Sequence, residues 1–119
     1  MKFTDSHEWI EVKEGLGTVG ISQHAQKELG EIVYVELPEE GKTVQAGKEA
    51  AVLESTKAAA DVYSPVSGTI ESVNKNLQAS PDLINTSPEN EGWIYTIRIS
   101  DETELDALMS KEDYLSKLP

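Results

Sequence analysis

Turn residues interrupt this chain at short intervals, and their spacing constrains the possible fold more than any other feature. Glycines and prolines recur roughly every ten residues, between runs rich in β-branched and aromatic side chains. Intervals of this length suit strands of about five or six residues and leave little room for long helices. The runs expected to form strands are 3–12, 18–21, 32–37, 43–44, 50–55, 61–64, 69–73 and 93–99. The pattern predicts a mainly β fold, either a sandwich or a flattened barrel.

Helix signals interrupt this β pattern early in the chain. Ser22 can accept a hydrogen bond from the first turn of a helix over residues 23–29. Gly30 stands where that helix would end, because glycine favours the backbone conformation that stops a helix. A further short helix is indicated near residues 81–84. We therefore expect a short helix after the second strand.

The C-terminal segment also carries helix signals. Asp101 with Glu104 fits a capping box, and Ser110 with Asp113 fits a second helix start. No linker composition or internal repeat divides the chain. We expect one domain over residues 1–119 with a helical C-terminus.

The composition disfavours several classes of function. Ten basic and 22 acidic residues give a net charge of −12, which disfavours binding to nucleic acids and anionic membranes. The sequence has no cysteine, which excludes disulfides and thiolate chemistry. No apolar run approaches the roughly 20 residues that span a bilayer, and no signal peptide is recognisable. We expect a monomer in a prokaryotic cytoplasm, or in the mitochondrial matrix if the chain is a processed eukaryotic protein. The negative charge fits partners that carry basic surfaces, and it equally fits a charge that only keeps the chain soluble and monomeric.

The common sequence patterns of enzymes are missing, and we expect a protein that is not itself an enzyme. There is no nucleophile elbow, zinc-protease helix, Walker A loop or dinucleotide-binding loop. His7 and His24 are the only imidazoles, and a single histidine more often packs or faces solvent than catalyses. They lack metal-binding spacing, so no metal site is predicted.

One lysine has an unusual setting. Lys57 lies between the expected strands 50–55 and 61–64, and three alanines follow it. Small neighbours would leave its ε-amine open to a modifying enzyme, while the strands would hold the base of the side chain. A long acyl group attached there would be presented to a docked enzyme at high effective concentration. On this segment alone, an ordinary exposed turn lysine is the slightly better interpretation.

The residues around Lys57 resemble a known family. Residues 54–58, ESTKA, are similar to the lipoylation motif ESVKA of glycine cleavage H proteins. Other elements resemble that family in the same order: SHEW at 6–9, VELP at 35–38, YSPVSG at 63–68 and GW at 92–93. The resemblance extends from about residue 3 to residue 115. Thr56 departs from the usual valine; both are β-branched, but the added hydroxyl bears on recognition by a lipoylating enzyme.

The resemblance implies a fold and a function. The fold would be lipoyl-domain-like, a barrel-sandwich hybrid of β-sheets with added helices. Lipoic acid would be joined to Lys57 as an amide, with lipoylating enzymes as partners. The arm would carry the aminomethyl group of glycine from a pyridoxal-phosphate glycine decarboxylase (P protein) to a folate-dependent aminomethyltransferase (T protein). A dihydrolipoamide dehydrogenase (L protein) would reoxidise the arm.

The resemblance also implies a surface cleft into which the loaded arm folds back. By similarity, Ser6, Glu8 and Asp61 are the candidate residues of this cleft. A cationic amine favours carboxylate and hydroxyl partners, which these side chains supply. The same residues also fit ordinary surface positions or turn caps.

Three other carriers remain as alternatives. A lipoyl domain of a 2-oxoacid dehydrogenase acyltransferase carries a motif like DKA, whereas Thr56 precedes Lys57 here. A biotin carrier has methionines on both sides of its lysine, whereas this chain has Thr56 and Ala58. An H-like lipoyl-relay protein outside glycine cleavage would use the same lysine, so the sequence leaves that alternative open.

Overall fold

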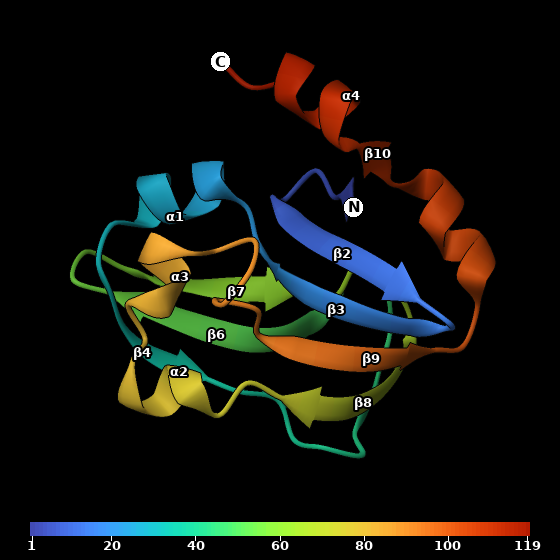
Figure 1. The fold of residues 1–119 in the computed structure, drawn as a ribbon, viewed down its shortest axis with the longest axis horizontal. Coiled ribbons are helices and arrows are strands. Elements are labelled where there is room, and N and C mark those ends of the chain that lie inside the picture. Colours follow the sequence, from blue (N-terminus) through green and yellow to red (C-terminus); the bar gives the residue numbers. More distant parts are fainter.

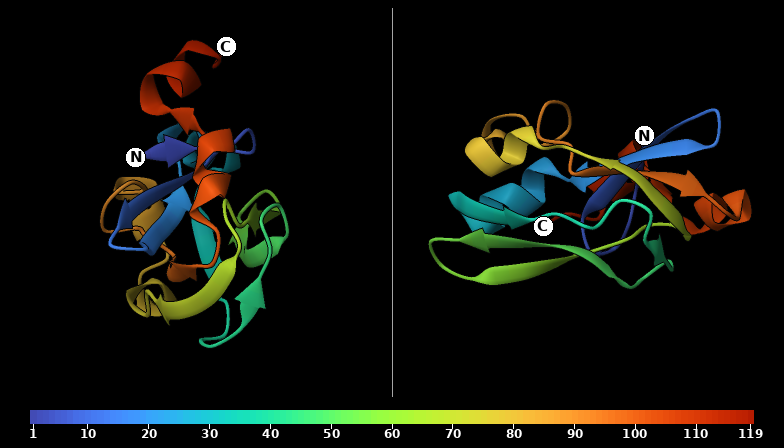
Figure 2. Two further views of the ribbon diagram at one scale, coloured as in Figure 1. Left: turned by 90° about the vertical axis from the view of Figure 1, so that its right-hand side faces the viewer. Right: turned by 90° about the horizontal axis from the view of Figure 1, so that it is seen from below.

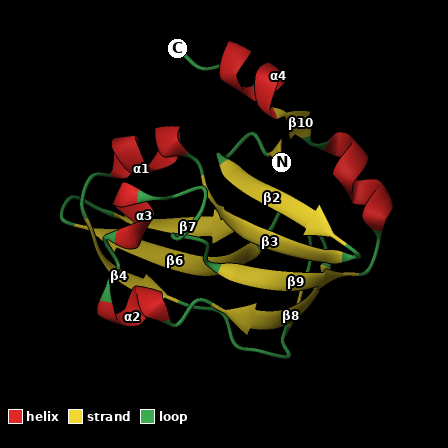
Figure 3. Ribbon diagram, in the orientation of Figure 1, coloured by secondary structure: helices red, strands yellow, loops and turns green.

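The computed structural model describes residues 1–119, and its ten strands form two antiparallel sheets (Figure 1, Figure 3). The larger sheet has the spatial order β10 (Met109–Ser110), β1 (Lys2–Phe3), β2 (Glu8–Lys13), β3 (Leu16–Ile21), β9 (Tyr95–Ile99), β8 (Gly68–Val73) and β5 (Thr43–Val44). The smaller sheet has the order β4 (Ile32–Glu36), β6 (Glu49–Ser55) and β7 (Ala59–Tyr63). The predicted mainly β fold is confirmed.

Five short helical segments join or follow the strands. They are α1 (Gln23–Leu29), α2 (Asn76–Ala79), α3 (Leu83–Thr86), the 3₁₀ segment η1 (Glu102–Ala107) and α4 (Lys111–Ser116). The helix over α1 forms as predicted, because the Ser22 hydroxyl accepts from the N–H of Ala25 at 3.1 Å and Gly30, at φ 82°, ends the helix. None of these helices is long and apolar enough to cross a membrane.

The core lies between the two sheets, and both sheets contribute to it. Along β6, Ala51 and Leu53 are buried while Glu54 faces outward, as expected for a strand with one face in the core. Val35 of β4 and Val62 of β7 belong to the same cluster of 16 buried apolar residues. This shared core fixes the β6–β7 hairpin to the body of the protein.

The N-terminal strand differs from its prediction. The expected strand over 3–12 is two strands, β1 and β2, joined by a tight turn in which Thr4 N donates to Glu8 O at 2.9 Å. His7 in this turn has a φ of 76°, which is uncommon for a residue other than glycine. The turn is stabilised because the Glu8 carboxylate accepts hydrogen bonds from the Thr4 and Ser6 hydroxyls. The hydropathy pattern does not predict hydrogen bonds between nearby polar side chains, so the turn between β1 and β2 was missed.

The helical C-terminus is confirmed, but the predicted capping box is not formed. Asp101 accepts from the N–H of Thr103 at 3.0 Å. The Glu104 carboxylate instead accepts from the N–H (2.7 Å) and the hydroxyl (2.9 Å) of Ser67, which joins η1 to the start of β8. Ser110 caps α4 as expected. A tertiary partner has therefore replaced the local one.

Candidate functional site

Lys57 lies at the bend between β6 and β7, and its side chain is exposed. The Ser55 hydroxyl shapes this bend by accepting from the backbone N–H groups of Lys57 (3.1 Å) and Ala58 (3.0 Å). The N–H of Thr56 donates to Glu31 O at 3.1 Å, which ties the bend to the loop between α1 and β4. Figure 2 shows the hairpin reaching one end of the molecule beside that loop. The base of Lys57 is thus fixed, and its amine is accessible.

A cleft of about 320 Å³ opens beside the hairpin. Its lining residues come from α1, from β6 and β7, from the end of β3, and from the turn before β2 and the first residue of that strand. The apolar lining comes from Ile21, Ala25, Leu29, Leu53, Ala60 and Val62. The polar lining comes from Ser6, His7, Glu8, His24, Glu28 and Asp61. The cleft can therefore hold an apolar chain that ends in a cationic group.

The structure brings the three candidate cleft residues, Ser6, Glu8 and Asp61, into this one cleft. Glu8 is only 2% exposed, and its carboxylate accepts hydrogen bonds from Ser6 Oγ (2.6 Å), the Thr4 hydroxyl and Tyr63 N (3.0 Å). Asp61 is exposed on β7 and forms no ion pair with the protein. The cleft thus offers one buried, oriented carboxylate and one that is free to meet a ligand.

The sequence did not point to His7, His24 or Glu28 as site residues, but all three line the cleft. The rings of His7 and His24 have centroids 4.8 Å apart, and His24 Nε2 lies 3.4 Å from Glu28 Oε1. The sequence did carry a signal for His24 and Glu28, namely their spacing on the predicted helix. Residues 24, 25, 28 and 29 share one face of the predicted helix, so placing one of them in a cleft would have placed the others.

Tyr114 of α4 connects the C-terminal helix to two walls of the cleft. Its hydroxyl lies 2.7 Å from His7 Nδ1 and 2.7 Å from Ser22 Oγ, and its ring stacks on Phe3 with centroids 4.4 Å apart. Burial raises the pKa of the Tyr114 phenol, with the hydrogen bond to Ser22 opposing that effect. The phenol is therefore neutral at physiological pH and can both donate and accept. It holds the His7 turn and the start of α1 in fixed relation.

Replacing Tyr114 with phenylalanine is expected to lower the free energy of unfolding by about 1–2 kcal/mol. Two hydrogen bonds are lost at roughly 1 kcal/mol each, while the ring stack on Phe3 remains. Urea denaturation followed by tryptophan fluorescence measures the change. Tyr34→Phe is the matched control, because Tyr34 is 54% exposed. Its replacement should change the free energy of unfolding by no more than about 0.5 kcal/mol. Equal effects of the two substitutions would contradict the structural role of Tyr114.

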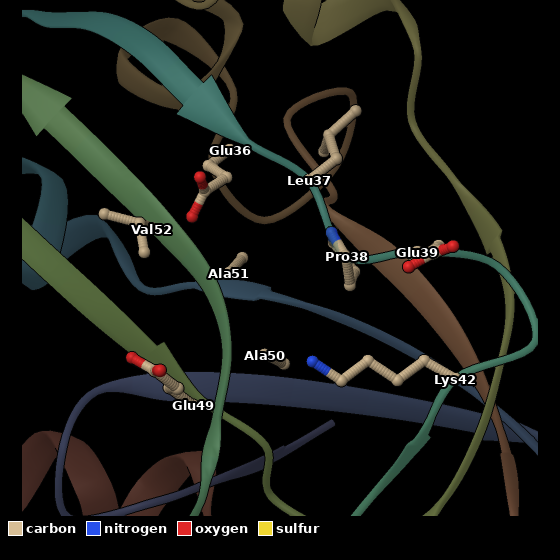
Figure 4. A pocket seen from close by; sticks show the side chains of 9 residues that line it. All are labelled: Glu36, Leu37, Pro38, Glu39, Lys42, Glu49, Ala50, Ala51 and Val52. Carbon is tan, nitrogen blue, oxygen red and sulfur yellow. The ribbon is translucent and has the colours of Figure 1, made fainter.

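A second hollow, of about 290 Å³, lies near the start of β6 (Figure 4). Glu36, Glu39 and Glu49 contribute carboxylates to it, and the Lys42 side chain extends across it. None of the candidate residues lies there, and Lys57 follows the opposite end of β6. The cleft beside the hairpin is therefore the candidate functional site.

Known proteins resemble this chain over nearly its whole length. The family model described as Glycine cleavage H-protein matches residues 1–119. The glycine cleavage system H protein of Thermotoga maritima is 50% identical over 113 residues, which are 95% of this chain and 91% of that protein. The one from Shewanella baltica (strain OS155) is 52% identical over 115 residues, which are 96% of this chain and 89% of that protein.

A solved structure agrees with these relatives. The crystal structure of a glycine cleavage system H protein from Mycobacterium marinum matches with a TM-score of 0.90 and 34% sequence identity. The match covers 98% of this chain and 94% of the other. It confirms the predicted architecture of a flattened β-barrel or sandwich with added helices.

Proposed function

Because the chain belongs to the glycine cleavage H-protein family, we propose that it serves the glycine cleavage system as a carrier with lipoic acid attached to Lys57. The observation that carries this proposal is an exposed amine at the bend of a fixed hairpin, directly beside a cleft. The whole chain acts as one carrier domain, without catalytic groups of its own. When bound, the lipoyl group would supply a disulfide that accepts two electrons and, once reduced, a sulfur that holds the one-carbon unit.

The length of α1, which lines one side of the cleft, supports a lipoyl arm. The seven residues of α1 span about 10 Å, and an extended eight-carbon chain is also about 10 Å long. One end of α1 lies beside the hairpin, because Thr56 N donates to Glu31 O just beyond that helix. The other end lies beside His7, because Ser22 N donates to His7 O at 2.9 Å. An arm that starts at Lys57 has the length to run along α1 to the polar end of the cleft.

The charges in the cleft support an aminomethyl cargo. An aminomethyl group is cationic at neutral pH, and Glu8, Glu28 and Asp61 place carboxylates along the cleft. Their attraction would hold the cargo away from water between enzymes. We propose that the partners are glycine decarboxylase, aminomethyltransferase, dihydrolipoamide dehydrogenase and a lipoylating enzyme. The net charge of −12 would speed encounters with basic surfaces on them.

The test of the function is glycine–bicarbonate exchange. The purified chain is lipoylated, mixed with glycine decarboxylase and glycine, and followed by incorporation of labelled bicarbonate. We expect exchange with the lipoylated chain and only background with the unlipoylated chain. A lipoylated chain that supports no exchange would contradict the glycine cleavage role and favour a lipoyl relay in another pathway.

Replacing Asp61 with asparagine is expected to speed the loss of the aminomethyl group from the loaded carrier about three- to tenfold. An exposed carboxylate–ammonium contact contributes roughly 1 kcal/mol, which corresponds to a change of this size. Release of ammonia from the loaded carrier measures the rate. Asp106→Asn is the control, because Asp106 is an exposed carboxylate on η1 outside the cleft. Identical rates for both variants would remove Asp61 from the site.

A further inference from the structure

We propose that Gly30 is a positioning residue for the acylated lysine: its missing side chain leaves a backbone surface across which the Lys57 arm passes from the hairpin bend into the cleft. The inference rests on the proposed attachment of lipoate at Lys57. It assigns a role to a residue outside the lipoylation motif and outside the lining of the cleft.

The space above Gly30 is filled by Lys57 itself. A Cβ atom at Gly30 would lie 2.9 Å from Cε of Lys57 and 3.5 Å from its Nζ. No atom of any other residue lies within 4 Å of that position, chain neighbours aside. The other glycines with positive φ, at positions 15, 41 and 47, have open space where a Cβ would lie. Helix termination explains the φ of 82° at Gly30, but it does not explain this contact.

Gly30 and the hairpin are held in register by hydrogen bonds. The Asn85 side chain donates to Gly30 O (2.9 Å) and accepts from Ile32 N (2.9 Å), which fixes the loop between α1 and β4. In the same loop, Glu31 O accepts from Thr56 N at 3.1 Å, next to Lys57. The backbone of the hairpin bend next to Lys57 is therefore held beside Gly30 by the fold. The hairpin bend and the end of α1 lie side by side in both Figure 1 and Figure 2.

The position of Gly30 also determines the direction in which the Lys57 arm leaves the hairpin bend. Glu28 and Leu29, which precede Gly30 on α1, line the cleft. A chain that continues from the amine of Lys57 across Gly30 thus meets the cleft within one helical turn. A methyl group at position 30 would obstruct this path. An unmodified lysine can rotate away from such an obstruction, whereas an arm seated in the cleft cannot do so without leaving it.

The experiment compares Gly30→Ala with Gly15→Ala in the full chain. Both positions have positive φ, 82° and 78°, so both variants carry backbone strain, but only position 30 faces Lys57. Lipoylation is checked by intact mass, and the reduced dithiol is then alkylated with iodoacetamide. We expect alkylation of Gly30→Ala to be about fivefold faster than in the wild type, because its arm spends more time outside the cleft. Gly15→Ala should match the wild type.

The outcomes separate this inference from the proposed function. A wild-type chain that gains no lipoyl mass would overturn the function and the inference together. Lipoylated proteins with equal alkylation rates would overturn the inference alone. A measurement on the wild type covers the case in which Gly30→Ala does not fold. Nuclear Overhauser contacts between the Gly30 α-protons and the Lys57 ε-protons are expected, and their absence would also overturn the inference.

Discussion

A Lys57→Arg variant is expected to gain no lipoyl group under conditions in which the wild type is fully modified. Acylation needs an amine that can lose its proton, and a guanidinium stays protonated in proteins. The substitution retains the charge and the approximate length of the side chain. Because Lys57 is exposed, the free energy of unfolding should change by no more than about 0.5 kcal/mol. Intact mass after incubation with a lipoylating enzyme and lipoate measures the difference.

Lys48 provides the matched control for this variant. It is an exposed lysine in the turn before β6, at the opposite end of the strand from Lys57. Lys48→Arg should be lipoylated as completely as the wild type. A full lipoyl gain in Lys57→Arg would instead mean that another lysine is the attachment site. Peptide mapping would then identify that lysine, and the cleft beside the hairpin would lose its connection to the arm.

The elements around Lys57 were predictable because their signals are local. The cap at Ser22 and the stop at Gly30 fixed both ends of α1. The runs on either side of Lys57 predicted the two strands of the hairpin, although β7 begins at Ala59 rather than at 61. A helix end or a hairpin bend depends mainly on residues within a few positions of it. The placement of Lys57 at a bend therefore followed from sequence.

The cleft could not be predicted from local patterns because distant contacts create it. Glu8 Oε2 accepts from Tyr63 N, which connects the N-terminal turn to β7 across 55 positions of sequence. Asn85 reaches the loop after α1 across a similar distance. Periodicity reports which face of an element is buried, but not which other element covers it. Ser6, Glu8 and Asp61 were chosen by resemblance alone, and only the structure shows that they share a cavity.

The strand β10 and the helix α2 had no usable sequence signal. The strand has only two residues and is defined by pairing with β1, where Phe3 faces Met109. The helix has four residues and no side-chain cap. Elements this short form because the surrounding fold places their ends, since a single turn is marginal in isolation. Tertiary contacts therefore determine whether these short elements form.

Glu8 is the cleft residue whose replacement should affect both stability and function. Glu8→Ala is expected to lower the free energy of unfolding by about 3 kcal/mol, because Tyr63 N and the two hydroxyls of Thr4 and Ser6 lose their acceptor. Glu8→Gln keeps the shape and one oxygen. The hydroxyls can rotate to accept from the new amide while the remaining oxygen faces Tyr63 N. Glu8→Gln should therefore lower the free energy of unfolding by only about 1 kcal/mol. Urea denaturation compares the variants.

The two Glu8 variants together separate the charge of the carboxylate from its structural role. If the charge holds the cationic cargo, Glu8→Gln should release the aminomethyl group roughly ten- to 150-fold faster than the wild type, because a hydrogen bond to a charged group is worth roughly 1.5–3 kcal/mol. If Glu8 only shapes the turn, Glu8→Gln should release it at the wild-type rate and only Glu8→Ala should be fast. Glu40→Ala, at an exposed turn position, controls for the overall negative charge. Release at the wild-type rate from both Glu8 variants would exclude this carboxylate from protecting the cargo.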